Sequence, residues 1–489
     1  MQHSKVINNL LETNKYCSDT TVLVNTFTAI LKEFKLSYIN SLFSKVKNRG
    51  FAGAKIFELL FVLRFIDVKN IQQLMSSGFS QDVSFKKDVF YDFLKNAKID
   101  WRNMLQLFNK QFGKIVEEKG DKAESYSPKC LILDDTQIDK TGKTIEFIGK
   151  VYDHCTHKYT LGMKVLTLGF WDEKSFTPQD FSIHNEPGKK GVRGLKAKEL
   201  KAQFSKTRQE ELPSAKRVKE VSMDKIEVGI SMIKNTFKKL SNVDYVLADS
   251  WFICEKFISE VTSLKSKSGK TLNVIGLMKS NRIITIGNKK HNGNKIPEVM
   301  CKNIKYSRLF KAHYINSVAD YKGIPMRIFW VRLKGQNGWK MLVSTDQKLT
   351  FAKAMKYYQI RWCIEVFFKD CKQNLNLCAC QSTDFDAQIA HITICFMQYI
   401  ALTLKKRFED YETFGELFRS LCKEITEMTL VEKIWVFLVE LFTVLFAEIE
   451  IELEIVLKLL FQNKTTVEET VKKAFACLLA APGIKEVFV

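Results

Sequence analysis

Two short apolar runs, each ending in aspartate, limit the fold more than any other feature of this chain. The first, "CLILDD", covers residues 130–135, and the second, "VDYVLAD", covers residues 243–249. Runs of this kind are typical of buried strands, and an acid that follows one lies at the carboxyl end of the strand. "TIEFIGKVYD" and "YTLGMKVLTLGFWD" add strand candidates between them, and "MDKIEVGISMIKNTFKKL" adds a helix. The sequence therefore predicts a mixed α/β core.

A third acid lies in the stretch "YYQIRWCIEVFFKDCK", residues 357–372, where apolar residues repeat at helical spacing. On one continuous helix, at about 100° per residue, three more polar side chains fall within about 40° of Glu365. They are Tyr358, Arg361 and Lys372. The buried face is then formed by Ile360, Ile364, Phe367 and Cys371. An ion pair between Arg361 and Glu365 on a surface helix would explain only half of this polar stripe.

The three acidic positions together indicate a site for divalent metal ions. They are Asp134 or Asp135, Asp249, and Glu365. Mg²⁺ prefers oxygen ligands, and two such ions about 4 Å apart activate the attacking oxygen and stabilise the leaving oxygen in phosphoryl transfer. A single aspartate after a strand is more often a helix cap or a turn residue. The order strand-Asp, strand-Asp, helix-Glu is what points to a shared site.

The chain carries an excess of positive charge. It contains 76 Lys and Arg against 54 Asp and Glu, a net charge of +22. Such an excess suits a polyanionic partner, although solubility alone would explain it equally well. Residues 189–219, with 11 Lys and Arg against 3 Glu, are predicted to form an exposed basic loop. A solvated linker and a contact to DNA phosphates are equally good explanations of that loop.

The 12 cysteines lack the spacing of a disulfide framework or a zinc site. Reduced thiols and a cytosolic protein are expected. The N-terminal residues show no apolar core of a signal peptide. The most apolar region, 430–461, is interrupted by Glu440 and Glu448, so no membrane span is predicted.

The remaining regions have simpler patterns. Residues 20–118 read as amphipathic helices, which suit either a plain helical bundle or a basic DNA-reading domain. Residues 281–338 are rich in Gly, Asn, Lys and β-branched residues, which predicts a β insertion with hairpin loops. Residues 400–489 are Glu-rich and mostly helical, with an ambiguous "EIEIELEI", and suit a protein contact.

The spacing Tyr358-x2-Arg361-x3-Glu365-x6-Lys372 resembles the Y-R-E-K signature of bacterial insertion-sequence DDE transposases of the insertion sequence four family. "LDDT" resembles the first acidic block of that family and "ADSWF" the second. The resemblance is close over about 130–400 and looser over the N-terminal helices. In the first block of the family the catalytic Asp lies two residues before Thr or Ser, which favours Asp134 over Asp135.

The resemblance implies an RNase H-like catalytic core with a β-strand insertion, flanked by helical N- and C-terminal domains. Residues 1–125 would be a helical DNA-binding domain, and 401–489 a helical domain suited to dimerisation. The core would comprise 126–280 and 339–400, the latter with the catalytic helix, separated by the insertion at 281–338.

The resemblance also implies roles for individual residues. Asp134, Asp249 and Glu365 would be catalytic and would hold two Mg²⁺ ions, with Mn²⁺ able to substitute. A homodimer in the bacterial cytosol would act on double-stranded DNA, at the terminal inverted repeats and at target DNA. It would hydrolyse the element ends and then join each freed 3′-OH to the target, as cut-and-paste transposition requires.

Four residues are implied to contact DNA. Tyr358, Arg361 and Lys372 would grip phosphates near the cleaved end. Trp339, in "GWKMLVSTD", would meet a base flipped out of the duplex, although packing against the strands of the insertion explains it equally well. Two alternatives to transposition stay open. One is a decayed or domesticated transposase that only binds DNA, and the other is a nuclease without strand transfer.

Overall fold

The computed structural model describes residues 34–423 apart from 35–36, 48–49, 67, 69, 77–85, 122–126, 154–155, 186–193, 241, 267–268 and 410. Residues Phe27–Cys422 form one compact unit. The helices expected before residue 34 and the C-terminal segment with "EIEIELEI" lie outside the described residues.

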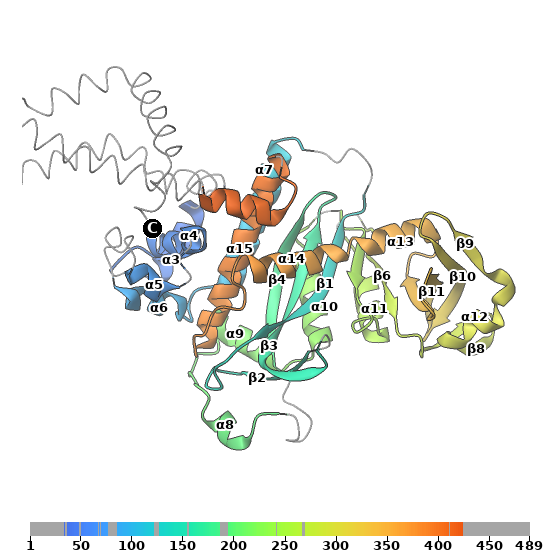
Figure 1. Cartoon of the computed structure of the whole chain (residues 1–489), viewed down its shortest axis with the longest axis horizontal. Coiled ribbons are helices and arrows are strands. Elements are labelled where there is room, and N and C mark those ends of the chain that lie inside the picture. The colour runs from blue at the N-terminus through green and yellow to red at the C-terminus, as the bar shows by residue number, and fades with distance from the viewer. Residues whose placement is uncertain are drawn as a thin grey trace, which may run out of the picture. The chain divides into compact units, whose positions relative to one another are not determined.

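One sheet of 12 strands runs through the described part of the chain (Figure 1). The first half is formed by β1 (Cys130–Asp139), β2 (Gly149–Asp153), β3 (Lys158–Trp171), β4 (Phe176–His184), β5 (Tyr245–Ala248) and β6 (Asn273–Met278). Strands β1, β3 and β4 pair antiparallel, with β2 also beside β3. Strand β5 then pairs parallel with β1, and β6 parallel with β5. The predicted mixed α/β class is confirmed.

The second half of the sheet contains the strands expected between 281 and 338. They are β7 (Ile283–Ile286), β8 (Lys289–Asn292), β9 (Lys305–Ser307), β10 (Ala312–Tyr321) and β11 (Ile324–Leu333), followed by β12 (Lys340–Ser344). Strand β12 pairs antiparallel with β6 on one side and with β11 on the other. The insertion therefore continues the core sheet rather than forming a sheet of its own.

Helices flank the sheet along the described part of the chain. They are α3 (Ser37–Val46), α4 (Gly53–Val62), α5 (Ile71–Ser76), α6 (Lys87–Leu94), α7 (Trp101–Glu118), α8 (Ala197–Lys201), α9 (Pro213–Val221), α10 (Lys225–Phe237), α11 (Glu255–Thr262), α12 (Ile296–Val299), α13 (Phe351–Gln359), α14 (Trp362–Gln373) and α15 (Phe385–Phe408). Short 3-10 turns lie at Leu63–Ile66, Gly293–Lys295 and Cys301–Asn303.

The alternation of side chains along β1 decides what lies on each face of the sheet. Leu133 packs under α10, where a Cβ on Gly229 would meet the Leu133 side chain at 2.7 Å. Asp135 points to the same face, since it pairs with Lys225 at the start of α10. Asp134 points to the opposite face, where α14 lies against β1.

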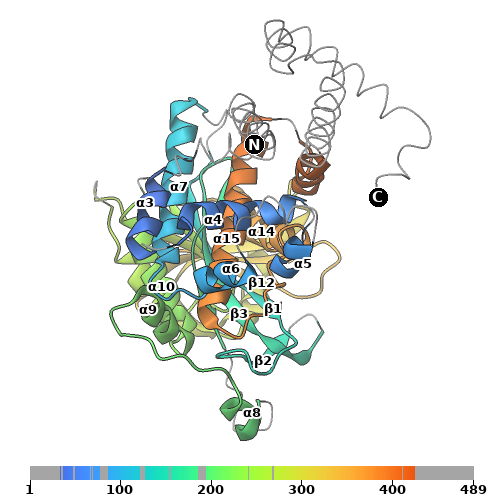
Figure 2. The same ribbon diagram turned by 90° about the vertical axis from the view of Figure 1, so that its left-hand side faces the viewer.

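Helix α15 is the central helix of this opposite layer. It packs against α7 and β4, and α4 and α6 also contact it (Figure 2). Among the described helices, α15 is long and apolar enough to cross a membrane, but 89% of its most apolar window is buried inside the protein. This burial is that of a core helix. The N-terminal helices are thus part of the compact unit that contains the sheet.

Candidate active site

The pairing of two parallel strands brings the two aspartates together. Leu133 of β1 is in register with Ala248 of β5, and the next residue of each strand is Asp134 and Asp249. Neighbouring strands lie about 4.8 Å apart. Strand β1 was expected to end at its aspartates, but it continues to Asp139 through its pairing with β3. Asp134 is therefore in mid-strand, and only its parallel partner β5 ends at this point.

The sequence predicted one continuous helix over the stretch that contains Glu365, but the structure shows two helices. Helix α13 ends at Gln359 and α14 begins at Trp362. Between them, the amides of Ile360 and Arg361 donate to carbonyls three residues earlier, at 3.1 and 3.0 Å. These i→i+3 bonds tighten the chain into a turn and break the regular helical ladder. The expected buried residues Ile364, Phe367 and Cys371 are buried, whereas Ile360 is half-buried.

Arg361 joins two of the three acids. Its Nη1 donates to Asp134 Oδ2 at 2.8 Å, and its Nη2 donates to Glu365 Oε1. The guanidinium side chain is 15% exposed. The geometry thus brings strand β1 and helix α14 together through one cation held between two carboxylates.

The electrostatic environment of this cluster is unusual. Burial, and then the nearby Asp249 carboxylate, raise the pKa of Asp134 to about 7, although the Arg361 guanidinium opposes the shift. Burial also raises the pKa of Tyr358 to about 12, and Asp249 and Asp134 add to that shift. Tyr358 is therefore within electrostatic range of both aspartates. Its hydroxyl and the Nε of Arg361 are buried and make no well-formed hydrogen bond with any described residue.

The other two expected DNA-binding residues lie further from the acids. Lys372 is exposed in the last turn of α14, about two turns beyond Glu365. Trp339 is half-buried, packs against the hydrophobic core and has the Arg332 guanidinium 4.8 Å from its ring centroid. Because β12 runs antiparallel to β6, Trp339 lies at the same edge of the sheet as Asp249, two strands away.

The donor set suits a divalent ion in its chemistry, because three carboxylates supply hard oxygen ligands. As positioned here, however, no group of three His, Cys, Asp or Glu residues among those described is close enough to hold a metal ion. Arg361 lies between Asp134 and Glu365, where both carboxylates share its single positive charge. The two unpartnered polar atoms of Tyr358 and Arg361 fit a site that receives a further polar group.

The basic segment at 189–219 is only partly the exposed loop that the sequence predicted. Arg208 is buried and binds Glu146 and Asp386, and Lys206 pairs with Asp384 and Asp386. These cations anchor the segment to the protein and are not free to contact phosphates. Charge runs in a sequence do not reveal which cations are paired internally.

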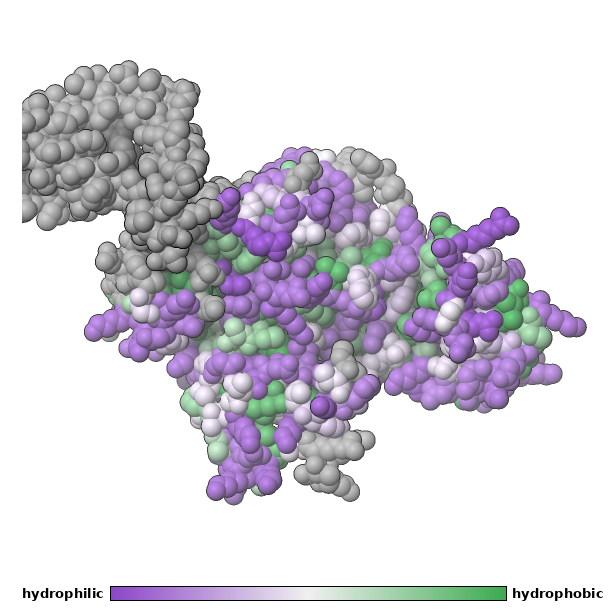
Figure 3. All heavy atoms as spheres, viewed as in Figure 1, coloured by the Kyte–Doolittle hydropathy of each residue, from purple (hydrophilic) through white to green (hydrophobic). Residues whose placement is uncertain are grey.

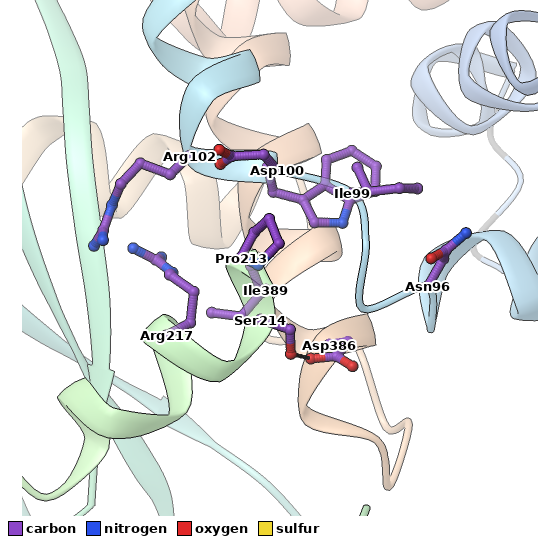
Figure 4. A pocket seen from close by; sticks show the side chains of 10 residues that line it. Asn96, Ile99, Asp100, Arg102, Pro213, Ser214, Arg217, Asp386 and Ile389 are labelled. Carbon is purple, nitrogen blue, oxygen red and sulfur yellow. Dashed lines mark hydrogen bonds between the residues drawn. The ribbon is translucent and has the colours of Figure 1, made fainter. Parts of the chain in front are cut away.

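A further cation of this segment, Arg217, lines a small cavity beside α9 (Figure 4). The Arg217 guanidinium lies 4.4 Å from the Phe181 ring centroid, with Asp180 and Glu220 at 3.6 and 3.5 Å. Burial and the neighbouring Arg102 lower its pKa to about 10. The cavity volume of about 20 Å³ suits one or two water molecules and is too small for a nucleotide. This cavity is therefore part of the structural framework.

The two consecutive aspartates of β1 should respond in opposite ways to loss of charge. Without divalent ions at pH 8, Asp134→Asn is expected to raise the free energy of unfolding by roughly 2 kcal/mol, because it removes a carboxylate whose charge is disfavoured by burial. The gain should vanish as pH falls from about 7 towards 4, where Asp134 is protonated in both states. Asp135→Asn should instead be destabilising, since it strips Lys225 of its partner at 2.7 Å. Urea unfolding of both variants at pH 8 and pH 5 measures this, and equal signs at pH 8 would contradict it.

Comparison with known proteins finds one family match. Residues 212–401 match the family model described as Transposase DDE domain, and Asp249 and Glu365 lie within this range. Asp134 lies before the matched region. No curated protein matches the chain. This region is therefore similar to the transposase DDE domain, which supports the interpretation of the protein as a DDE transposase.

Proposed function

We propose that the protein is a DNA transposase of the insertion sequence four type that moves its element by cut-and-paste transposition. The observation that carries this proposal is the clamp of Arg361 on Asp134 and Glu365, with Asp249 on the adjacent parallel strand. The order of strands β4-β3-β1-β5-β6 supports an RNase H-like core, in which three antiparallel strands precede two parallel ones.

In this proposal Asp134, Asp249 and Glu365 hold two Mg²⁺ ions, for which Mn²⁺ can substitute. When bound, the ions supply positive charge that stabilises the transition state of phosphoryl transfer. Arg361 and Tyr358 bind the phosphate next to the cleaved bond. Lys372 contacts the DNA backbone further along. Each end is first hydrolysed, and the freed 3′-OH then attacks the target DNA.

The β insertion supports a DNA partner. Residues 281–338 contain 12 Lys and Arg against 2 Asp and Glu, so this short region supplies a large share of the net charge. The insertion, on the right of Figure 3, presents a mostly hydrophilic surface. Cations in this excess bind phosphates and release counterions. A homodimer that holds both element ends in the bacterial cytosol, through the helical domain at 401–489, is part of the same proposal.

A direct test uses labelled DNA that carries the two ends of the element flanking the gene, with Mg²⁺. Transposition yields nicked ends and then products joined to target DNA. Binding without nicks would instead indicate a decayed or domesticated transposase, and nicks without joined products a nuclease. Affinity for the ends should also fall steeply between low and physiological salt. A nearly flat salt dependence would contradict the proposed phosphate contacts.

Trp339→Ala is expected to slow strand opening at the element end several-fold while sparing the first nick. The reason is that an aromatic face recovers part of the cost of unstacking a flipped base. Gel assays that separate nicked from opened ends measure both steps. An abasic nucleotide at the flipped position should partly rescue the variant. If Trp339→Ala slows nicking and opening equally, is not rescued and lowers the melting temperature, then Trp339 only packs in the core.

A further inference from the structure

An exposed tryptophan lies directly beside one of the candidate catalytic acids. Trp251 is 42% exposed and follows Asp249 by two residues. Its backbone N–H donates to Asp249 Oδ1 at 2.8 Å. The acid and the aromatic ring therefore belong to one short turn between β5 and α11.

The ring of Trp251 is held from the protein side by a charged pair. The Lys225 ammonium lies 4.5 Å from the ring centroid, and its Nζ is 2.7 Å from Asp135 Oδ2. These two side chains are only 16% and 22% exposed, and a cation over an aromatic ring attracts it more strongly when water is excluded. Phe252 packs edge-to-face against the same ring, with centroids 4.9 Å apart. An exposed ring is thus fixed in one place before anything binds it.

A single exposed apolar residue usually needs no explanation. Here the ring is held by Lys225, which is paired with Asp135, the second aspartate of "LDDT". Asp135 takes no part in the Arg361 cluster, which lies on the other face of β1. A pre-fixed aromatic ring loses little conformational entropy on binding. Stacking of one nucleobase on such a ring contributes about 1–3 kcal/mol and tolerates any base.

We propose that Trp251 is a stacking platform for an unpaired nucleobase of the DNA next to Asp249, and that Lys225, held by Asp135, positions its ring. The inference rests on the proposed function, since it takes DNA as the substrate. Lys225 and Asp135 act through Trp251 and are positioning residues. The platform favours DNA ends with unpaired nucleotides over fully paired duplex.

Two DNA probes without divalent ions test the platform apart from any cleavage. One is an end with a short single-stranded overhang carrying 5-iodouracil, which crosslinks to a stacked aromatic side chain under light. The other is the blunt duplex. Trp251→Ala should weaken overhang binding by about 5- to 150-fold and abolish the crosslink, with blunt-duplex affinity within about two-fold of wild type. Trp251→Phe should retain most of the binding, and Phe408→Ala, another exposed aromatic at the end of α15, should change nothing.

Variants of Lys225 and Asp135 should change overhang binding in a way that their charges alone would not explain. Asp135→Asn removes a negative charge, which by charge alone would tighten DNA binding, whereas loss of the support should weaken overhang binding and lower the crosslink yield. Lys225→Met should do the same, and the double variant should be no worse than Lys225→Met. Unchanged overhang binding in Trp251→Ala, or a crosslink that maps to another residue, would overturn the inference while leaving the proposed function intact. Wild-type protein that binds neither probe would instead overturn the proposed function.

Discussion

Glu365→Gln abolishes cleavage of the element ends, with an expected loss of at least about a thousand-fold, while DNA binding and folding are retained. Glutamine keeps the volume and the hydrogen-bonding oxygen but removes the charge that holds a divalent ion. The several kcal/mol of transition-state stabilisation supplied by bound metal corresponds to a loss of this size. Single-turnover cleavage of a labelled end, with binding measured on the same DNA, gives both quantities.

Asp249→Asn and Asp134→Asn should behave in the same way. Asp370→Asn is the matched control, because Asp370 is a half-buried acid on the same helix as Glu365 but outside the acidic cluster. It should keep most of the activity. If Asp135→Asn cannot cut and Asp134→Asn can, then the first acid has been assigned to the wrong face of β1.

Removal of Arg361 should produce the second large effect, this time on stability. In the absence of divalent ions, Arg361→Ala leaves Asp134 and Glu365 without their shared cation, and roughly 2–3 kcal/mol of the free energy of unfolding should be lost at pH 8. Added Mg²⁺ should restore more stability to the variant than it adds to the wild-type protein, because metal charge replaces the guanidinium.

Denaturant unfolding with a chelator and with Mg²⁺ measures this difference. Arg361→Lys is the control, since a lysine ammonium can keep one of the two ion pairs but lacks the fork that binds both carboxylates. It should fall between the wild-type protein and the alanine variant. An equal gain from Mg²⁺ in all three proteins would show that the acids do not bind metal where Arg361 lies.

The parts of the site that depend on local pattern could be predicted from the sequence. Apolar runs gave β1 and β5, and the parallel pairing of such strands is enough to bring Asp134 beside Asp249. Strand β4 was missed because Pro178 and Asp180 interrupt its apolar pattern, and a proline is unusual inside a strand. The structure accommodates Pro178 where the register with β3 shifts, next to Gly169.

The remaining features depend on contacts between distant segments. Period-two alternation places Asp134 and Asp135 on opposite faces, but only the packing of α14 and α10 decides which face holds Arg361 and which holds Lys225. The turn at 360–361 likewise has no sequence signal, since neither residue is Gly or Pro. Its tightened hydrogen bonds lie where Arg361 reaches across to β1.

The pairing of β12 between β6 and β11 has a mechanical consequence. Two backbone ladders join the insertion to the strand next to Asp249, so the insertion cannot swing on its connecting segments as a hinged lid would. If DNA binding bends the insertion, we expect the paired strands β12, β6 and β5 to carry part of that bending to the loop that begins at Asp249. The continuous sheet would then couple the insertion mechanically to the candidate active site.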